Sequence, residues 1–107
     1  MEDLLLALRA IGESTRLRIV AVLARSELTV GELCRVLGQT QPRVSRHLRL
    51  LCEAGLLDRN AQGTSAFYRP ARAGRGRELF DAILPLIDDD DVGFQSDLRR
   101  LAAIRAE

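Results

Sequence analysis

The chain contains 107 residues, of which 47% are hydrophobic and 29% are charged, and its formal net charge is +1. A chain of this length has room for one modest core, so we expect residues 1–107 to form a single domain. The sequence holds no apolar run of the roughly 18 residues that a membrane-spanning helix needs, which argues against a membrane protein.

Two helices are predicted in the first quarter of the chain. On the first helix Leu4, Leu5, Leu8 and Ile11 form an apolar stripe, and an exposed stripe of this kind is typical of a dimerisation surface. The second helix, residues 15–25, is apolar on several sides. We therefore expect this second helix to lie in the middle of the core.

A pair of helices joined by a tight turn is predicted next. Thr29 is placed to cap a short helix whose apolar residues follow with helical spacing, and Gly38 is placed to end it. About three residues later a second helix begins, and we expect it to run from Gln41 to Ala54. This spacing predicts a helix-turn-helix unit, in which the second helix enters the major groove of DNA.

The helix from Gln41 to Ala54 separates an apolar face from a basic one. Its apolar face is made of Val44, Leu48, Leu51 and Cys52. Its opposite face carries Pro42, Arg46, Arg49 and Glu53, flanked by Arg43 and Ser45. Thr40 is expected to be the N-cap, and Gly55 follows the last turn. The start of the helix would therefore present free N–H groups and basic side chains to a phosphate.

A short β-hairpin is predicted after this helix, with strands at residues 57–60 and 64–69. Gly63 in the connection suits a positive φ. The predicted fold is mainly α with a small β-hairpin wing. It is a winged helix-turn-helix in which four helices, two strands and two further helices follow in order.

The two C-terminal helices are predicted at residues 76–86 and from about Phe94 onward. The run from Asp88 to Asp91 between them is expected to be a solvated linker whose last residue caps the final helix. On that helix Phe94, Leu98 and Leu101 form a second apolar stripe, which we also expect at the dimer interface.

Charge is distributed unevenly along the chain. Residues 35–77 hold nine arginines against two acidic residues, a net charge of +7, whereas residues 1–34 carry −1 and residues 78–107 carry −5. A basic middle between acidic ends is typical of a phosphate-facing surface with a separate assembly surface. Some winged helices bind proteins, so a protein-interaction module remains the structural alternative.

Residues 4–69 contain five segments that occur together in one known family, namely Ser14–Ile19, Glu27–Leu33, Gln41–Leu48, Gly55–Leu57 and Phe67–Arg69. On these segments the chain resembles the ArsR/SmtB family of arsenic- and metal-responsive repressors. It implies a dimeric bacterial repressor with an α-helical core and a β-wing, whose partner is double-stranded DNA. The last residues, 97–107, also resemble the connector of longer proteins that join such a domain to a methyltransferase, so a regulatory fragment of such a fusion is a further alternative.

By resemblance, Gln41, Pro42, Ser45 and Arg46 occupy positions that contact bases and phosphates. Gln41 is expected to read adenine, Arg46 to read guanine, and Ser45 to hold a phosphate. His47 is interpreted as a packing residue or a phosphate contact rather than a catalytic group. The full predicted DNA-binding set is Thr40, Gln41, Pro42, Arg43, Ser45, Arg46, Arg49, Arg59, Gln62 and Arg69.

The ligands of the family's metal sites are missing. Many members carry a Cys-x-Cys pair at positions that are Thr29 and Gly31 here, and a second zinc site needs histidines on the last helix, whereas the only histidine is His47. We therefore expect no metal and no cofactor. Cys34 and Cys52 lie on the apolar faces of adjacent helices and are interpreted as packing residues, with a dithiol sensor as the alternative.

Taken together, these features predict a cytoplasmic homodimeric transcriptional repressor and not an enzyme. It would bind an inverted repeat and be released by an unidentified effector, either a small molecule or an oxidant.

Overall fold

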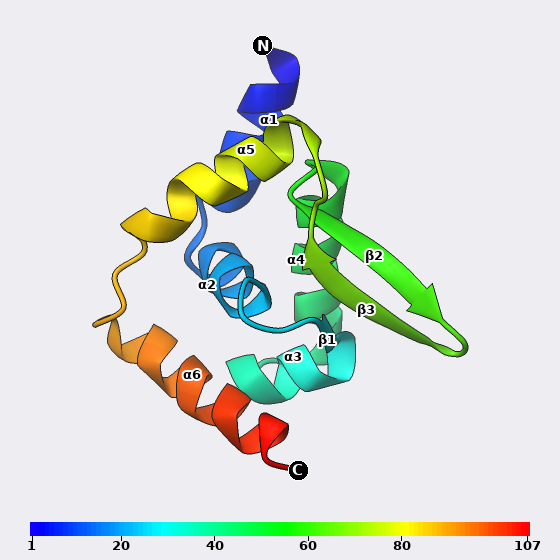
Figure 1. Cartoon of the computed structure of the whole chain (residues 1–107), viewed down its shortest axis with the longest axis vertical. Helices are drawn as coiled ribbons and strands as arrows, with labels where there is room; N and C mark the ends of the chain where they lie inside the picture. Colours follow the sequence, from blue (N-terminus) through cyan, green and yellow to red (C-terminus); the bar gives the residue numbers. More distant parts are fainter.

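The computed structural model describes all residues from Met1 to Glu107 (Figure 1). In chain order the elements are α1 (Glu2–Ile11), α2 (Ser14–Leu23), β1 (Leu28–Thr29), α3 (Val30–Leu37), α4 (Gln41–Glu53), β2 (Leu57–Gln62), β3 (Ser65–Pro70), α5 (Gly74–Ile83), the 3-10 helix η1 (Leu84–Leu86) and α6 (Val92–Arg105). This confirms the predicted class, a mainly α fold with a small β-hairpin. None of the helices is both long and apolar enough to cross a membrane.

The core is built around α2, which lies near the centre of the molecule (Figure 1). Ile19, Val20 and Val22 of α2 have no exposed surface, as predicted for a central helix. The apolar face of α4 packs inward against α2, as the full burial of Val44 and Leu48 shows. Burial of the apolar face turns the opposite face of α4 toward solvent.

The turn between α3 and α4 is defined by its caps. The hydroxyl of Thr29 accepts a hydrogen bond from the Glu32 N–H at 3.2 Å, and the Glu32 carboxylate accepts one from the Thr29 N–H at 2.9 Å. This reciprocal pair fixes the start of α3. Gly38 ends the helix with a φ of 66°, a left-handed conformation that glycine adopts without strain. The helix-turn-helix spacing is confirmed, since α4 begins at Gln41.

The sheet has three antiparallel strands in the order β1-β3-β2. The predicted hairpin is present, although its strands extend further than expected and its turn is reduced to Gly63, with a φ of 60°, and Thr64. Strand β1 is absent from the prediction. It has only two residues, too few to show an alternating pattern, and it exists because Leu28 pairs with Tyr68 of β3.

Two predictions about the C-terminal helices need correction. The α-helix predicted at residues 76–86 ends at Ile83, and Pro85, which has no N–H to donate, lies in η1. The exposed stripe predicted on the last helix is wrong, because Phe94 and Leu101 are each only 2% exposed and belong to the chain's own core, and Leu98 packs against that core. The reason is that α6 folds back onto α2 and α3.

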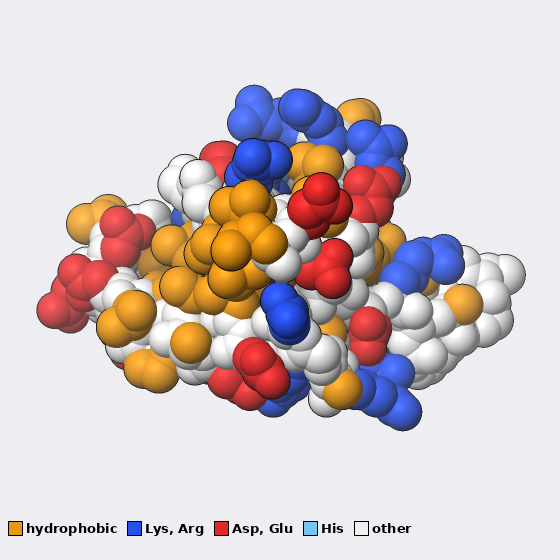
Figure 2. All heavy atoms as spheres, turned by 90° about the horizontal axis from the view of Figure 1, so that it is seen from above, with side chains coloured by type: hydrophobic (Ala, Val, Ile, Leu, Met, Phe, Trp, Pro, Cys, Tyr) orange, Lys and Arg blue, Asp and Glu red, His pale blue; other side chains and the backbone are white.

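The opposite end of the molecule carries the exposed apolar surface. Leu4, Leu5, Leu6 and Leu8 of α1 are between 37% and 48% exposed. In the view from the α1 end, hydrophobic side chains gather in a patch on this face (Figure 2). The leucines of the stripe predicted on the first helix are therefore exposed, with Leu6 as an addition. The prediction is wrong for Ile11, which is 5% exposed and belongs to the core.

Gly76 marks the closest approach between two elements. A Cβ at this position would lie 1.9 Å from the carbonyl oxygen of Gly55, in the turn between α4 and β2. The backbone of the first helical turn of α5 therefore contacts the backbone of the α4–β2 connection, and only glycine fits at position 76.

Candidate nucleic-acid interface

Helix α4 presents most of the predicted contact residues on one surface. Gln41, Pro42, Arg43, Arg46 and Arg49 are exposed. The exposure follows from the burial of the opposite face, which fixes the rotation of the helix about its axis. The sequence therefore places these five side chains correctly on the solvent side of α4.

The three arginines on this surface differ in their partners. Arg49 lies 3.9 Å from the Glu53 carboxylate, one helical turn away on the same exposed face. Neither Arg43 nor Arg46 forms an ion pair. Both line a shallow pocket of roughly 310 Å³ together with His47. Arg43 and Arg46 are thus free to pair with an anion from outside the chain.

The first turn of α4 is organised differently from the prediction. Thr40 is the N-cap residue and has an extended backbone, but its side chain makes no capping hydrogen bond. Pro42 lies in the first turn, where its missing N–H leaves nothing unpaired. The Gln41 side-chain amide instead donates to the Ser45 hydroxyl at 3.1 Å. The N–H groups at the start of α4 are therefore not capped by Thr40.

His47 faces the interior side of α4 and contacts α2. Its side chain is only 12% exposed, and its Nδ1 lies 3.2 Å from a guanidinium nitrogen of Arg16 and 3.8 Å from a carboxylate oxygen of Glu13. A guanidinium only donates, so the contact with Arg16 favours the neutral imidazole with Nδ1 as acceptor, whereas the Glu13 carboxylate favours the charged form. Burial is the main cause that lowers the pKa of His47. The packing interpretation of His47 agrees with this environment, whereas its partners on α2 had no signal in the sequence.

The predicted wing residues do not share one face of the hairpin. Arg59 pairs in register with Tyr68, whereas Arg69 pairs with Asp58, so alternation puts Arg59 on one face and Gln62 with Arg69 on the other. Arg59 and Gln62 are exposed. The guanidinium of Arg69 is engaged, because it lies 3.6 Å from the Glu27 carboxylate and the side chain is only 24% exposed.

Both cysteines are free thiols and half-buried. Burial raises the pKa of Cys34, and burial raises the pKa of Cys52 to about 11. A higher pKa means less thiolate near neutral pH, and the thiolate is the reactive form. The environment therefore suits packing better than sensing. No three His, Cys, Asp or Glu side chains are grouped so that they could hold a metal ion.

Comparison with known proteins places these residues among DNA-binding regulators. Residues 13–59, from the end of the α1–α2 turn into β2, match a family model described as bacterial regulatory protein, arsR family. The chain is 47% identical over 62 residues to the arsenical resistance operon repressor of Escherichia coli K12. These aligned residues make up 57% of this chain and 53% of that protein. It is also 35% identical over 81 residues to the biofilm growth-associated repressor of Agrobacterium fabrum. This alignment covers 76% of this chain and 68% of that protein.

Solved structures show the same fold. The homodimeric winged helix-turn-helix DNA-binding domain of Mb0332 from Mycobacterium bovis superposes with a TM-score of 0.71 at 25% identity, over 83% of this chain and 82% of that one. HlyU from Vibrio cholerae gives a TM-score of 0.69 at 27% identity, over 79% of this chain and 91% of the HlyU chain. The chain spans about half the length of the arsenic-resistance relatives from E. coli and Pseudomonas putida that it matches, 53% and 48% respectively.

Proposed function

Because the chain belongs to the arsR family of bacterial regulatory proteins, we propose that it is a DNA-binding transcriptional regulator that acts as a repressor. The observation that carries this proposal is the exposed face of α4, where Arg43 and Arg46 have no ion-pair partner and stand opposite a fully buried apolar face. Residues 1–107 act as one domain in this proposal. Its family consists of regulators rather than enzymes.

In the proposed complex, α4 enters the major groove with its N-terminal turn leading. Gln41 reads adenine and Arg46 reads guanine, because these side chains make the matching bidentate hydrogen bonds. Arg43 and Ser45 contact phosphates beside the groove. Arg59 and Gln62, on opposite faces of the exposed hairpin, contact the DNA beside the groove from the two faces of the wing. We leave Arg69 out of the proposed contacts, since Glu27 already occupies it.

The proposed assembly is a homodimer that pairs through α1. The exposed leucines of α1 support this, as does the homodimeric state of the similar Mb0332 domain. Phe94 and Leu101 cannot contribute while they lie in the core of their own chain. A two-fold axis through α1 would present two α4 helices to successive major grooves, about 34 Å apart, on an inverted repeat.

The effector that releases the proposed repressor from DNA is not identified by the relatives. The raised pKa of Cys52 speaks against an oxidant acting at this thiol. A small molecule is therefore the effector class that we favour.

The test is fluorescence anisotropy of the purified protein on the duplex upstream of its own gene, against a scrambled duplex of equal length and composition. We expect binding at least about a thousandfold tighter to the natural duplex, and affinity that falls steeply as salt is raised. Equal affinity for both duplexes would contradict sequence-specific regulation. Absence of binding to either duplex at low salt would favour a protein-interaction module instead.

A further inference from the structure

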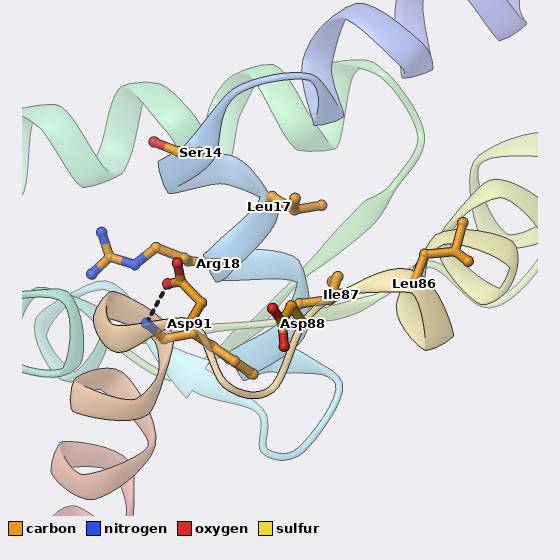
Figure 3. A pocket seen from close by; sticks show the side chains of 8 residues that line it. Ser14, Leu17, Arg18, Leu86, Ile87, Asp88 and Asp91 are labelled. Carbon is orange, nitrogen blue, oxygen red and sulfur yellow. Dashed lines mark hydrogen bonds between the residues drawn. The ribbon is translucent and has the colours of Figure 1, made fainter.

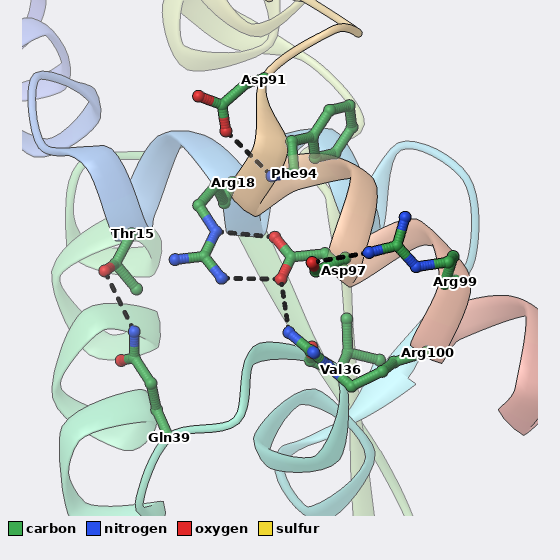
Figure 4. A network of polar contacts seen from close by, with 10 residues as sticks. Thr15, Arg18, Val36, Gln39, Asp91, Phe94, Asp97, Arg99 and Arg100 are labelled. Carbon is green, nitrogen blue, oxygen red and sulfur yellow. Dashed lines mark hydrogen bonds and ion pairs between the residues drawn. The ribbon is translucent and has the colours of Figure 1, made fainter.

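The start of α2 is held from two sides. Toward α6, it borders a pocket of roughly 240 Å³ beside Phe94 (Figure 3). There the guanidinium of Arg18 donates to both carboxylate oxygens of Asp97, at 2.7 and 2.6 Å, and Asp97 has no exposed surface (Figure 4). Toward α4, the Gln39 side-chain amide donates to the Thr15 hydroxyl at 3.3 Å (Figure 4). The start of α2 is therefore a fixed support beside the helix-turn-helix.

Two charged side chains of this support meet His47 of α4. The Nδ1 atom of His47 lies 3.2 Å from a terminal guanidinium nitrogen of Arg16 and 3.8 Å from a carboxylate oxygen of Glu13. Arg16 is anchored through its Nε, which donates to the carbonyl of Ala10. Glu13 is anchored because its carboxylate accepts a hydrogen bond from the Arg16 N–H at 3.0 Å. One ring nitrogen of His47 is thereby turned toward α2.

The other ring nitrogen of His47, Nε2, has no hydrogen-bond partner in the chain. Only two buried side-chain polar atoms lack a partner, and neither belongs to His47, so Nε2 is open to solvent. His47 lines the shallow pocket on α4 together with Arg43 and Arg46, which form no ion pair. The hydrogen bond from Arg16 to Nδ1 favours the tautomer with its proton on Nε2. The free protein thus presents an N–H group beside two unpaired arginines.

We propose that Arg43 and His47 together bind one backbone phosphate of DNA, and that this binding takes up one proton at His47. The site rests on the proposed function, in which α4 enters the major groove. The two side chains lie one helical turn apart, so a single phosphate can reach both. Nε2–H donates to a phosphate oxygen, and a proton from solvent goes to Nδ1, whose new N–H donates to the Glu13 carboxylate. Arg16 then gives up its bond to Nδ1 and keeps its bond to Ala10.

Four charged side chains face the imidazole and influence its protonation. Arg16, Arg43 and Arg46 oppose the charged form and Glu13 favours it, while burial is the main cause that holds the pKa of His47 below its usual 6.5. A phosphate in the pocket adds a second negative charge and compensates the arginines, so the pKa of His47 is higher in the complex. Because the complex then binds more protons than the free protein, DNA affinity rises as pH falls.

His47 is the only histidine of the chain, so it gives a single imidazole signal, and histidine is the side chain that titrates between about pH 5.5 and 7.5. Isotope-edited NMR of its Cε1–H group measures the pKa in the free protein and in complex with the duplex upstream of the gene. Anisotropy over the same pH range, at constant low salt, measures the affinity. The test variant is His47→Gln, which keeps an N–H donor and does not titrate. The control is Arg49→Ala, which removes a charge from the same helix outside the pocket.

We expect a higher pKa of His47 in the complex, and DNA affinity of the parent that increases at least about threefold from about pH 7.5 to about pH 5.5. Arg49→Ala should bind more weakly and keep this pH dependence, whereas His47→Gln should lose it. Sequence-preferring binding with an unchanged pKa of His47, or with equal pH dependence in His47→Gln, would overturn the site alone. Absence of DNA binding at every pH would contradict the proposed function as well. The NMR comparison uses only the parent protein, so it decides the question even if His47→Gln does not fold.

Discussion

Individual arginines on α4 differ in what they can offer DNA, although they look equivalent in the sequence. Arg49 shares its charge with Glu53, whereas Arg43 and Arg46 have no acidic partner. Arg46 also lies one turn nearer the N-terminus of α4, which is the end that leads into the groove. In the proposed complex, specific reading of a base therefore depends on Arg46 more than on Arg49.

Replacement of Arg46 by alanine should cost about 1 to 3 kcal/mol of binding free energy to the natural duplex and relax the preference at one base pair, because one bidentate contact is lost. The matched control is Arg49→Ala, which removes the same charge from the same face. Competition anisotropy with single-base-pair variants of the duplex measures both effects. Uniform weakening on every duplex would show that Arg46 contacts only phosphate.

His47 makes stability depend on pH. Burial lowers the pKa of His47 below its usual 6.5, so the unfolded chain binds more protons than the folded one just below pH 6.5. The stability contributed by neutral His47 is complete above the unfolded-state pKa of about 6.5, and it is lost as pH falls below 6.5 through the lower pKa of the folded protein. Urea unfolding should therefore show a loss of stability as pH is lowered below about 6.5, and this loss should be smaller in His47→Gln. Glu13 does not interfere, because its pKa lies below 4.5. An identical pH dependence in both proteins would contradict this account.

At the scale of elements, helices are joined by contacts that local patterns do not reveal. The helix periods, the N-cap at Thr29 and the positive φ at Gly63 are local features, and the sequence predicts them correctly. Strand β1 and the position of α6 depend on partners far along the chain, Tyr68 for Leu28 and Arg18 for Asp97. For that reason the amphipathic pattern of the last helix does not reveal that Phe94 and Leu101 are buried in the core of their own chain.

The same limit applies to the candidate site. Because the rotation of α4 follows from its own apolar face, the exposed set from Gln41 to Arg49 could be predicted. The engagement of Arg69 by Glu27 could not, since it requires the pairing of β1 with β3. Likewise, the predicted hairpin strands ended too early for the opposite faces of Arg59 and Gln62 to be recognised.

The crossing of α5 over the turn after α4 gives a prediction at this scale. Gly76→Ala should destabilise the protein by about 1 to 3 kcal/mol or more, because the new methyl group overlaps the Gly55 carbonyl. Gly31→Ala is the control, since its Cβ meets nothing closer than 4.0 Å and alanine favours the helix by about 0.5 to 1 kcal/mol. Thermal unfolding of both variants measures the difference. A Gly76→Ala protein as stable as the parent would show that the two backbones are further apart.

The ion pair that attaches α6 to α2 gives a second prediction at the scale of elements. Asp97→Ala should cost about 3 kcal/mol of unfolding free energy, because it leaves Arg18 without its buried counterion. Arg99→Ala removes an exposed charge from the same helix and should change stability by no more than about 0.5 kcal/mol. Guanidinium unfolding followed by circular dichroism measures the unfolding free energy of both variants. Similar losses in the two variants would mean that the ion pair does not hold α6 in place.

The whole molecule combines a basic surface, an apolar surface and a pocket on three different parts of the fold. The α4 surface carries the unpaired Arg43 and Arg46, the α1 surface carries exposed leucines, and the pocket lies beside Phe94. Helix α2 packs against both α4 and α6, so it connects the proposed DNA surface to the pocket. In the proposed repressor, dimer assembly and DNA recognition therefore use separate side chains.

Dimerisation can be tested by placing charges on α1. Leu5→Glu/Leu8→Glu should raise the dimer dissociation constant at least about a hundredfold, because two carboxylates would be buried without partners. Val92→Glu is the control, since Val92 is exposed and lies on α6. Sedimentation velocity over a range of protein concentrations reports the assembly state. A double variant that remains dimeric and helical would place the interface elsewhere.

Hydroxyl-radical footprinting on the duplex upstream of the gene tests the central claim most directly, since it reports recognition and symmetry together. The account predicts two protected stretches on one side of the duplex, related by a two-fold axis and spaced by about one helical turn of 10 to 10.5 base pairs. A single protected stretch, or uniform weak protection along the whole duplex, would contradict a symmetric repressor that reads DNA through α4.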